Sequence, residues 1–228
     1  MNAQTVRELA VAAGNAYQQA PPNGASILID AVGQDRGFML ASDASITISI
    51  RGTVSIEDAE TDAEVMLEHE EGGLVHFGFW REYTAIRSQV DAFIKAHPEA
   101  TNIRVTGHSL GGAIATLIAE NAFGGGRTVQ LLTLGSPRVG NTDFCHAFDR
   151  LILDSVRVVH AYDLIPRVPK LGYDHVGGLL HLDDKGHPTQ CSWYGVLWND
   201  FVTRKSLADH HVMGYLCALE MYLKGMAT

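Results

Sequence analysis

The chain has 228 residues, of which 46% are hydrophobic and 19% charged, a composition that excludes a disordered or fibrous protein. This length suits a single α/β domain over residues 1–228, because α/β units commonly reach this size undivided. Lys and Arg number 17 and Asp and Glu 26, and the resulting net charge of −9 argues against nucleic acid as a partner.

Cysteine content and hydropathy exclude further classes of protein. Cys145, Cys191 and Cys217 are too few and scattered for a disulfide scaffold or a zinc site, so we expect reduced thiols, with one bridge as the alternative. No apolar run approaches the roughly 18 residues of a membrane span. The first 22 residues do not resemble a secretory signal, so the cytoplasm is the default location. Secretion is expected instead if a signal has been removed or another export route is used.

The N-terminal part of the chain predicts a helix followed by short strands. Apolar residues recur at helical spacing as far as Tyr17, and the two prolines at 21–22 end this helix. Strands are predicted over residues 26–32, 38–41 and 45–50. Eight carboxylates then fall within residues 57–71, a stretch expected to be a solvated loop and edge hairpin.

Helices and strands alternate through the middle of the chain. A long helix is predicted over residues 79–96, where large apolar side chains form one buried stripe, and another over residues 110–123. Strands are predicted over residues 103–106, 129–134 and 156–161. Nearly continuous apolar strands that alternate with helices are typical of a mostly parallel sheet covered on both faces. We therefore predict one α/β domain.

The segment Gly-His-Ser-Leu-Gly at residues 107–111 carries the clearest chemical signal. A G-x-S-x-G pattern between a strand and a helix is typical of a nucleophile elbow, a turn so sharp that its glycines leave no room for a Cβ. Such a turn presents the serine hydroxyl at the carboxyl end of the sheet, beside a helix N-terminus that favours negative charge. Ser109 is the predicted nucleophile, with a structural turn as the alternative. His108 should form local contacts, because it points away from Ser109.

A serine nucleophile needs a base, and the base needs an acid that orients it. With this elbow the acid and then the base follow the serine in the chain. Asp163 comes directly after the predicted strand over 156–161, at the sheet edge where active sites form. Asp163 is therefore the predicted acid. Weaker candidates, all in turn-like contexts, are Asp174, Asp183, Asp184 and Asp200.

The base must be one of the later histidines. His210 stands just before the apolar stripe of the last predicted helix and is free to point into a site, so it is the predicted base. The adjacent His211 remains the alternative. The other late histidines are expected to be hydrogen-bonded or solvent-facing; they are His175, His181 and His187.

Further motifs accompany the elbow in a fixed order. They are IRGTVSIED at 50–58, VHFGF at 75–79, VTGHSLGGAIATL at 105–117, LGSPRVGN at 134–141, and DLIPRVP at 163–169 with YDHVGG at 173–178. In these motifs, which span roughly residues 44–216, the sequence resembles the class 3 lipase family, an alpha/beta-hydrolase group that includes filamentous-fungal triacylglycerol lipases. The resemblance implies an alpha/beta-hydrolase fold, with a mostly parallel central sheet flanked by helices.

The resemblance also implies a serine carboxylic-ester hydrolase. Ser109 would be the nucleophile, Asp163 the acid, and the histidine before the last helix, best matched by His210, the base. The oxyanion hole would combine the backbone N–H groups of Thr53 and Leu110, with the Thr53 hydroxyl as a further donor. Such donors contribute about 3 kcal/mol each to transition-state stabilisation. A strand-terminating turn is the alternative role of Thr53.

The expected substrate is a lipid or short-chain ester, with at most transient contact with a lipid interface. No metal or cofactor is expected, since the sequence has no cluster with ligand spacing and no phosphate-binding loop. Alternative activities are those of a phospholipase A1, an aryl-ester (feruloyl-type) esterase or an acyltransferase. A more distant alternative is a lipid-binding domain without catalysis. The oligomeric state stays open.

The chain departs from the family after the oxyanion turn. Relatives often have Trp where this chain has Ala59, and the fungal enzymes have a partly apolar lid helix in that region. Here residues 55–75 are acidic, and their compact apolar run is limited to residues 65–67, which could still form a small lid. We expect weak interfacial activation and a preference for soluble or short-chain esters. The aromatic segment 192–201 either walls an acyl pocket or packs on the surface.

Overall fold

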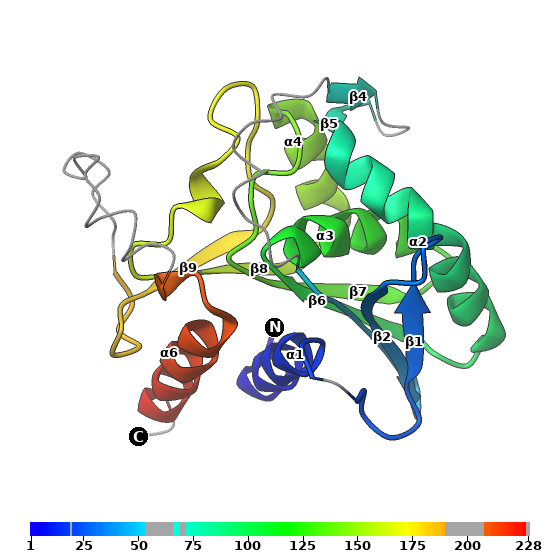
Figure 1. Ribbon diagram of the computed structural model, residues 1–228, viewed down its shortest axis with the longest axis horizontal. Helices are drawn as coiled ribbons and strands as arrows, with labels where there is room; N and C mark the ends of the chain where they lie inside the picture. Colours follow the sequence, from blue (N-terminus) through cyan, green and yellow to red (C-terminus); the bar gives the residue numbers. More distant parts are fainter. Residues whose placement is uncertain (19, 53–65, 69–71, 190–207, 227–228) are drawn as a thin grey trace.

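The computed structural model describes residues 1–18, 20–52, 66–68, 72–189 and 208–226. Within these residues a central sheet has the strand order β1-β2-β3-β6-β7-β8-β9 (Figure 1). Its strands are β1 (Ser26–Ile29), β2 (Asp35–Ser42), β3 (Ser45–Ile50), β6 (Asn102–His108), β7 (Thr128–Leu134), β8 (Asp154–His160) and β9 (Gly178–Leu182). A separate antiparallel pair is formed by β4 (Met66–Glu68) and β5 (Leu74–His76).

The central sheet is mostly parallel, as predicted. β1 pairs with β2 and β2 with β3 in antiparallel fashion, whereas every neighbouring pair from β3 to β9 is parallel. The carboxyl ends of β3, β6, β7 and β8 therefore meet at one edge of the sheet. The segments carrying the predicted nucleophile and acid leave the sheet at this edge.

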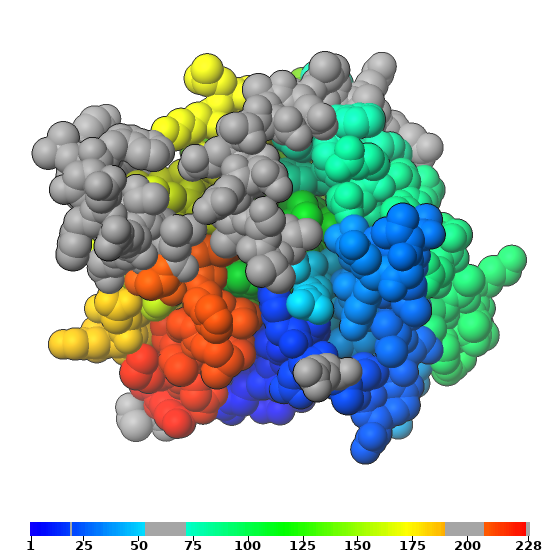
Figure 2. All heavy atoms as spheres, in the orientation of Figure 1, coloured from blue at the N-terminus to red at the C-terminus, as the bar shows by residue number. Residues whose placement is uncertain are grey.

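Helices cover both faces of the sheet (Figure 1). One face carries α2 (Phe77–Ala96), α3 (Leu110–Ala122) and α4 (Thr142–Leu151), and the other carries α1 (Ala3–Asn15) and α6 (Val212–Gly225). Figure 2 shows the blue N-terminal atoms beside the orange and red atoms of the C-terminal segment on one face of the molecule. In the described residues, no helix is both long and apolar enough to cross a membrane.

Each face of the sheet has its own apolar core. One core joins α2, α3 and α4 to the sheet, and the other joins α1 and α6 to it. The alternation predicted for β3 explains how one strand serves both layers. Ile48 is fully buried toward the first core, whereas the buried Ser49 faces α1 and donates its hydroxyl hydrogen to the carbonyl of Ala12 at 2.9 Å.

Some element boundaries differ from those predicted. The first helix ends at Asn15 instead of continuing to the prolines at 21–22. The strand predicted over 26–32 stops at Ile29, because the Asp30 carboxylate accepts hydrogen bonds from the N–H groups of Val32 and Gln34 and so forms a turn. A short 3₁₀ helix, η2 (Ile165–Arg167), follows β8.

Candidate active site

Ser109 lies in a strained turn between β6 and α3. Its φ of 58° and ψ of −132° place a non-glycine residue in a rarely occupied conformation. A Cβ on Gly107 would lie 2.2 Å from the carbonyl oxygen of Gly111, and one on Gly111 would lie 2.3 Å from the carbonyl oxygen of Ile50. Glycine is therefore required at both positions, because the strand, the helix and the end of β3 approach one another too closely for a side chain.

Asp163 and His210 form a buried pair beside this turn. His210 Nδ1 lies 2.6 Å from Asp163 Oδ2, and the two residues are only 2% and 1% exposed. The same carboxylate oxygen accepts the hydroxyl hydrogen of Tyr215 at 2.5 Å, and Oδ1 accepts the N–H of Ile165 at 2.9 Å. Burial raises the pKa of Tyr215 well above its usual value, so its hydroxyl stays a donor.

The hydrogen bond to Asp163 determines the tautomer of His210. Because the carboxylate oxygen accepts at Nδ1, that nitrogen carries the proton and Nε2 of the neutral ring presents a lone pair. Nε2 is buried and has no hydrogen-bond partner in the part of the chain that the structure describes. Such an atom is suited to accept a proton from a reacting group.

The adjacent His211 has a different environment. It is exposed and stands at the N-cap of α6, where its Nδ1 accepts the N–H of Met213 at 3.3 Å. The structure thus brings His210, and not His211, to the predicted acid. His175 and His181 bond backbone carbonyl oxygens through Nε2, and the exposed His187 contacts the Asp183 carboxylate.

The predicted oxyanion donors are described only in part. Leu110 is the first residue of α3, so its N–H has no partner within the helix and belongs to the positive end of the helix dipole. Thr53 lies outside the described residues, but the preceding Gly52 is described. A Cβ on Gly52 would lie 3.0 Å from Ser109 Cβ, so Gly52 itself lies directly beside the predicted nucleophile.

His108 makes the local contacts expected of it. Its Nδ1 lies 2.7 Å from the hydroxyl of Tyr17, and its Nε2 lies 2.7 Å from the carbonyl oxygen of His210. Burial, with a contribution from neighbouring His210, lowers the pKa of His108 to about 3, so its ring is neutral at ordinary pH. Sequence reasoning missed Tyr17, which it placed in the apolar stripe of the first helix.

The comparisons with known proteins agree with this geometry. The family model Lipase (class 3) matches residues 47–173 of the 228, which is more than half of the chain. The chain belongs to the class 3 lipase family. A phospholipase A1-II 1 from Oryza sativa subsp. indica is 31% identical to this chain over 188 residues, and the match covers 69% of this chain and 48% of the relative. A secreted mono- and diacylglycerol lipase 1 from Fusarium solani is 35% identical over 159 residues, covering 64% and 47%.

Solved structures are similar to this chain in fold. A lipase from Rhizopus microsporus var. chinensis has a TM-score of 0.65 and 28% identity, and the match covers 79% of this chain and 75% of that one. A Yarrowia lipolytica lipase has a TM-score of 0.69 at 23% identity, over 91% and 90% of the two chains. The α/β-hydrolase fold is thus confirmed. The chain spans about half the length of the curated relatives it matches.

Several predictions fall on residues outside the described ones. They concern Thr53, Ala59, most of the possible lid over 55–75, Cys191, and the aromatic segment 192–201 with Asp200. The lid and the acyl-pocket wall therefore stay predictions. Ser136, in the turn after β7, donates its hydroxyl hydrogen to the carbonyl of Pro137 at 3.0 Å.

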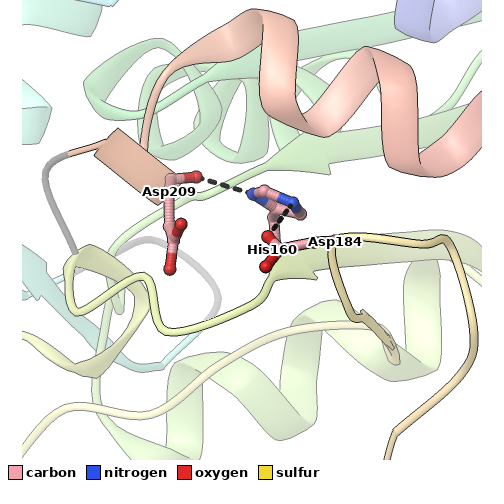
Figure 3. A group of neighbouring side chains, drawn as sticks. All are labelled: His160, Asp184 and Asp209. Carbon is pink, nitrogen blue, oxygen red and sulfur yellow. Dashed lines mark hydrogen bonds and ion pairs between the residues drawn. The ribbon is translucent and has the colours of Figure 1, made fainter. Parts of the chain in front are cut away.

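One group of potential metal ligands occurs among the described residues of the chain (Figure 3). The ligand atoms of His160, Asp184 and Asp209 lie within 4.8 Å of one another. His160 Nδ1 donates to the Asp209 carbonyl at 2.9 Å, its Nε2 lies 3.4 Å from Asp184 Oδ1, and Asp209 Oδ2 accepts the N–H of Tyr162 at 3.0 Å. Each ligand has a protein partner, so these contacts join β8 to the segment that carries His210. That no metal is needed stays a prediction.

Proposed function

We propose that this chain is a serine carboxylic-ester hydrolase of the lipase and esterase type that acts through an acyl-enzyme. The observation that carries the proposal is the buried Asp163–His210 hydrogen bond of 2.6 Å near the strained Ser109 turn. Within the described residues, Nε2 of this histidine has no hydrogen-bond partner. Such an arrangement converts a weak hydroxyl nucleophile into a reactive one.

The proposed reaction has two halves. His210 Nε2 accepts the Ser109 proton as Oγ attacks the ester carbonyl carbon, and the C=O π electrons move to the oxygen. The Leu110 N–H and the Thr53 N–H stabilise this oxyanion. As the carbonyl re-forms, the C–O bond to the alcohol breaks and the alcohol takes the proton from His210. Water then attacks the acyl-enzyme with His210 as base, which releases the acid and restores Ser109.

Asp163 stabilises the protonated base that forms in each half-reaction. Besides His210, its carboxylate accepts hydrogen bonds from Tyr215 and from the backbone of Ile165. These hydrogen bonds hold the carboxylate in place beside the imidazole. An acid held in this position keeps the proton of neutral His210 on Nδ1 and stabilises the imidazolium.

The substrate class proposed is a lipid or short-chain ester. Two relatives favour lipid esters, since one is a phospholipase A1 and the other a mono- and diacylglycerol lipase. Phospholipase A1 activity is therefore the second candidate, and aryl-ester hydrolysis and acyl transfer remain alternatives. The preference for short soluble esters rests on the acidic residues 55–75 and stays a prediction. We also propose that residues 1–228 form one domain.

The location of the protein is likewise a proposal. The Fusarium solani relative is a secreted lipase and supports export, in place of the cytoplasmic location expected by default. Fractionation of the native host into cells and medium, with an antibody against the chain, separates the two possibilities.

Labelling with a fluorophosphonate probe tests the proposed mechanism. The probe forms a covalent bond only with an activated serine, so peptide mapping should find the adduct on Ser109 in the wild type. Labelling should disappear in Ser109→Ala and fall strongly in His210→Ala. A wild-type protein that stays unlabelled would contradict catalysis and favour the lipid-binding alternative. Product esters formed in the presence of a competing alcohol would indicate acyl transfer.

A further inference from the structure

Two side chains outside the proposed triad connect its parts. Tyr17 follows α1, and His108 directly precedes Ser109. The Tyr17 oxygen accepts the N–H of Gly52 at 3.0 Å and lies 2.7 Å from His108 Nδ1. His108 Nε2 lies 2.7 Å from the carbonyl oxygen of His210. These three linked hydrogen bonds form one network, which joins the turn after α1, the end of β3, the elbow and the segment before α6.

The chemistry of the groups fixes the direction of each hydrogen bond. A carbonyl oxygen only accepts, so His108 Nε2 must donate to His210. In the neutral ring Nδ1 then accepts, and the Tyr17 hydroxyl donates to it while accepting from Gly52. Burial lowers the pKa of His108 to about 3 and raises that of Tyr17 to about 12, so both stay neutral throughout the working range of an esterase.

The packing around Gly52 shows how tightly this residue is held between Tyr17 and His108. A Cβ on Gly52 would lie 2.6 Å from the Tyr17 hydroxyl oxygen and 2.7 Å from the His108 carbonyl oxygen. The guanidinium of Arg51 lies 5.5 Å from the centre of the Tyr17 ring. Because the Gly52 N–H donates to the Tyr17 hydroxyl oxygen, it is not available to stabilise an oxyanion.

At the other end of this hydrogen-bond network, His108 contacts the proposed base His210. The ring centres of His108 and His210 lie 4.7 Å apart, so His108 contacts both the backbone and the imidazole of His210. His210 itself comes from the segment before α6, outside the central sheet. Its position relative to the end of β3 therefore depends on contacts such as these.

We propose that Tyr17 and His108 are positioning residues. They align Gly52, the residue before the proposed oxyanion donor, with the proposed base His210 around Ser109. The proposal rests on the proposed esterase function. Neither residue touches the reacting atoms; Tyr17 holds the peptide of Gly52, and His108 holds the backbone of His210. Alignment matters because a displacement of about 1 Å in such a site costs up to about 100-fold in rate.

Three substitutions test the hydrogen bonds of Tyr17 and His108 separately. Tyr17→Phe keeps the ring but removes the hydroxyl, which leaves the Gly52 N–H and His108 Nδ1 without this partner. His108→Leu removes both hydrogen bonds of the imidazole. His108→Gln retains an N–H donor of suitable reach for the His210 carbonyl. Tyr222→Phe, on α6 in the apolar core beside α1, is the matched control for loss of a tyrosine hydroxyl.

The test measures kcat and KM for p-nitrophenyl butyrate, normalised to the serine that a fluorophosphonate titrates, with thermal unfolding alongside. We expect Tyr17→Phe to lower kcat about 10-fold and His108→Leu about 100-fold, with KM changed by less than about 2-fold. His108→Gln should recover most of the activity. The double variant Tyr17→Phe/His108→Leu should lose less than the product of the two single losses, because the Tyr17–His108 hydrogen bond couples the two residues. Tyr222→Phe should behave as wild type.

Each contrary result has a distinct meaning. Suppose that Ser109→Ala is inactive but that Tyr17→Phe and His108→Leu keep the wild-type kcat per titrated serine. The positioning role is then wrong, even if these two variants unfold at a lower temperature. Independent, multiplicative losses in the double variant would also overturn it. If Ser109→Ala is as active as the wild type, or if the wild type neither hydrolyses esters nor reacts with the probe, the esterase function itself fails, and the positioning role with it.

Discussion

Asp163 illustrates how a single residue can be assigned from its place in the sequence. It follows an apolar strand in a mostly parallel sheet, and such strand ends converge at one edge. The structure places its carboxylate in contact with His210, a residue 47 positions further along the chain. Sequence reasoning predicted both residues, because each stands at the boundary of an element with a clear apolar pattern.

Tyr17 and His160 show where residue-level reasoning stops. Both are hydrogen-bonded to residues distant in sequence, His108 in one case and the Asp209 backbone in the other. The sequence around a tyrosine at the end of an apolar stripe does not indicate that its hydroxyl forms a hydrogen bond with the backbone of a distant residue. Only the packing of α1 against the sheet brings Tyr17 to Gly52.

Substituting the two adjacent histidines tests which of them is the base. His210→Ala should lower kcat/KM by at least about 1,000-fold, since the proposed triad loses its proton acceptor. His211→Ala should retain activity within about 3-fold and lose on the order of 1 kcal/mol of stability, because it removes a helix cap. Steady-state kinetics with a soluble ester and urea unfolding check the pair. Loss of activity in His211→Ala alone would reverse the assignment.

At the level of elements, apolar periodicity predicted which segments are helices and strands better than it predicted where they end. The strict alternation of β3 gave its bounds, Ser45–Ile50, without error. The ends of α1 and β1 depend on turns and on contacts made elsewhere, such as the Asp30 carboxylate with the following N–H groups. A side chain that ends a helix or strand bonds a backbone group nearby in the sequence. Whether it does so depends on which other hydrogen-bond partners the fold brings within its reach.

The elbow depends on the close approach of β6 to α3. Gly107→Ala places a methyl group 2.2 Å from the Gly111 carbonyl oxygen, so it should destabilise the fold by about 3 kcal/mol or more and abolish activity. Gly225→Ala is the control, since its Cβ would meet nothing within 4 Å. That variant should unfold within about 1 kcal/mol of the wild type. Chemical denaturation measures both. A stable, active Gly107→Ala would contradict the geometry of the elbow.

For the whole molecule, buried neutral histidines predict sensitivity to acid. Burial lowers the pKa of His108 to about 3 and that of His175 to about 4, from 6.5 in the unfolded chain. The unfolded state therefore binds more protons between these values, so this contribution to stability is complete above about pH 6.5 and is lost as the pH falls. At pH 4.5 the loss should be about 3 kcal/mol for each histidine.

Urea unfolding of the wild type and His175→Gln between pH 8 and pH 4.5 measures this effect. We expect the wild type to lose stability steadily below pH 6.5 and the variant to lose less over the same range, whatever its stability at pH 8. Parallel curves for the two proteins would show that His175 does not carry the acid sensitivity.

The whole molecule also determines how far relatives inform its activity. The fold matches that of solved lipases, with a TM-score of 0.65 for the Rhizopus microsporus var. chinensis enzyme, whereas this chain spans only about half the length of its curated relatives. Fold and family were accessible from sequence because several motifs occur in family order. The substrate preference could not be predicted equally well, because it rests on the composition of residues 55–75 and 192–201, and composition alone does not specify a pocket.

Hydrolysis of p-nitrophenyl esters from acetate to palmitate by the wild type and Ser109→Ala tests the central claim most directly. We expect the wild type to be active, with its optimum among the shorter chains, and Ser109→Ala to lose at least about 1,000-fold in kcat. An optimum at palmitate would contradict the short-chain preference but leave the triad intact. Equal activity of the two proteins, or no activity of either against any ester in the series, would contradict the assignment of this chain as a serine esterase.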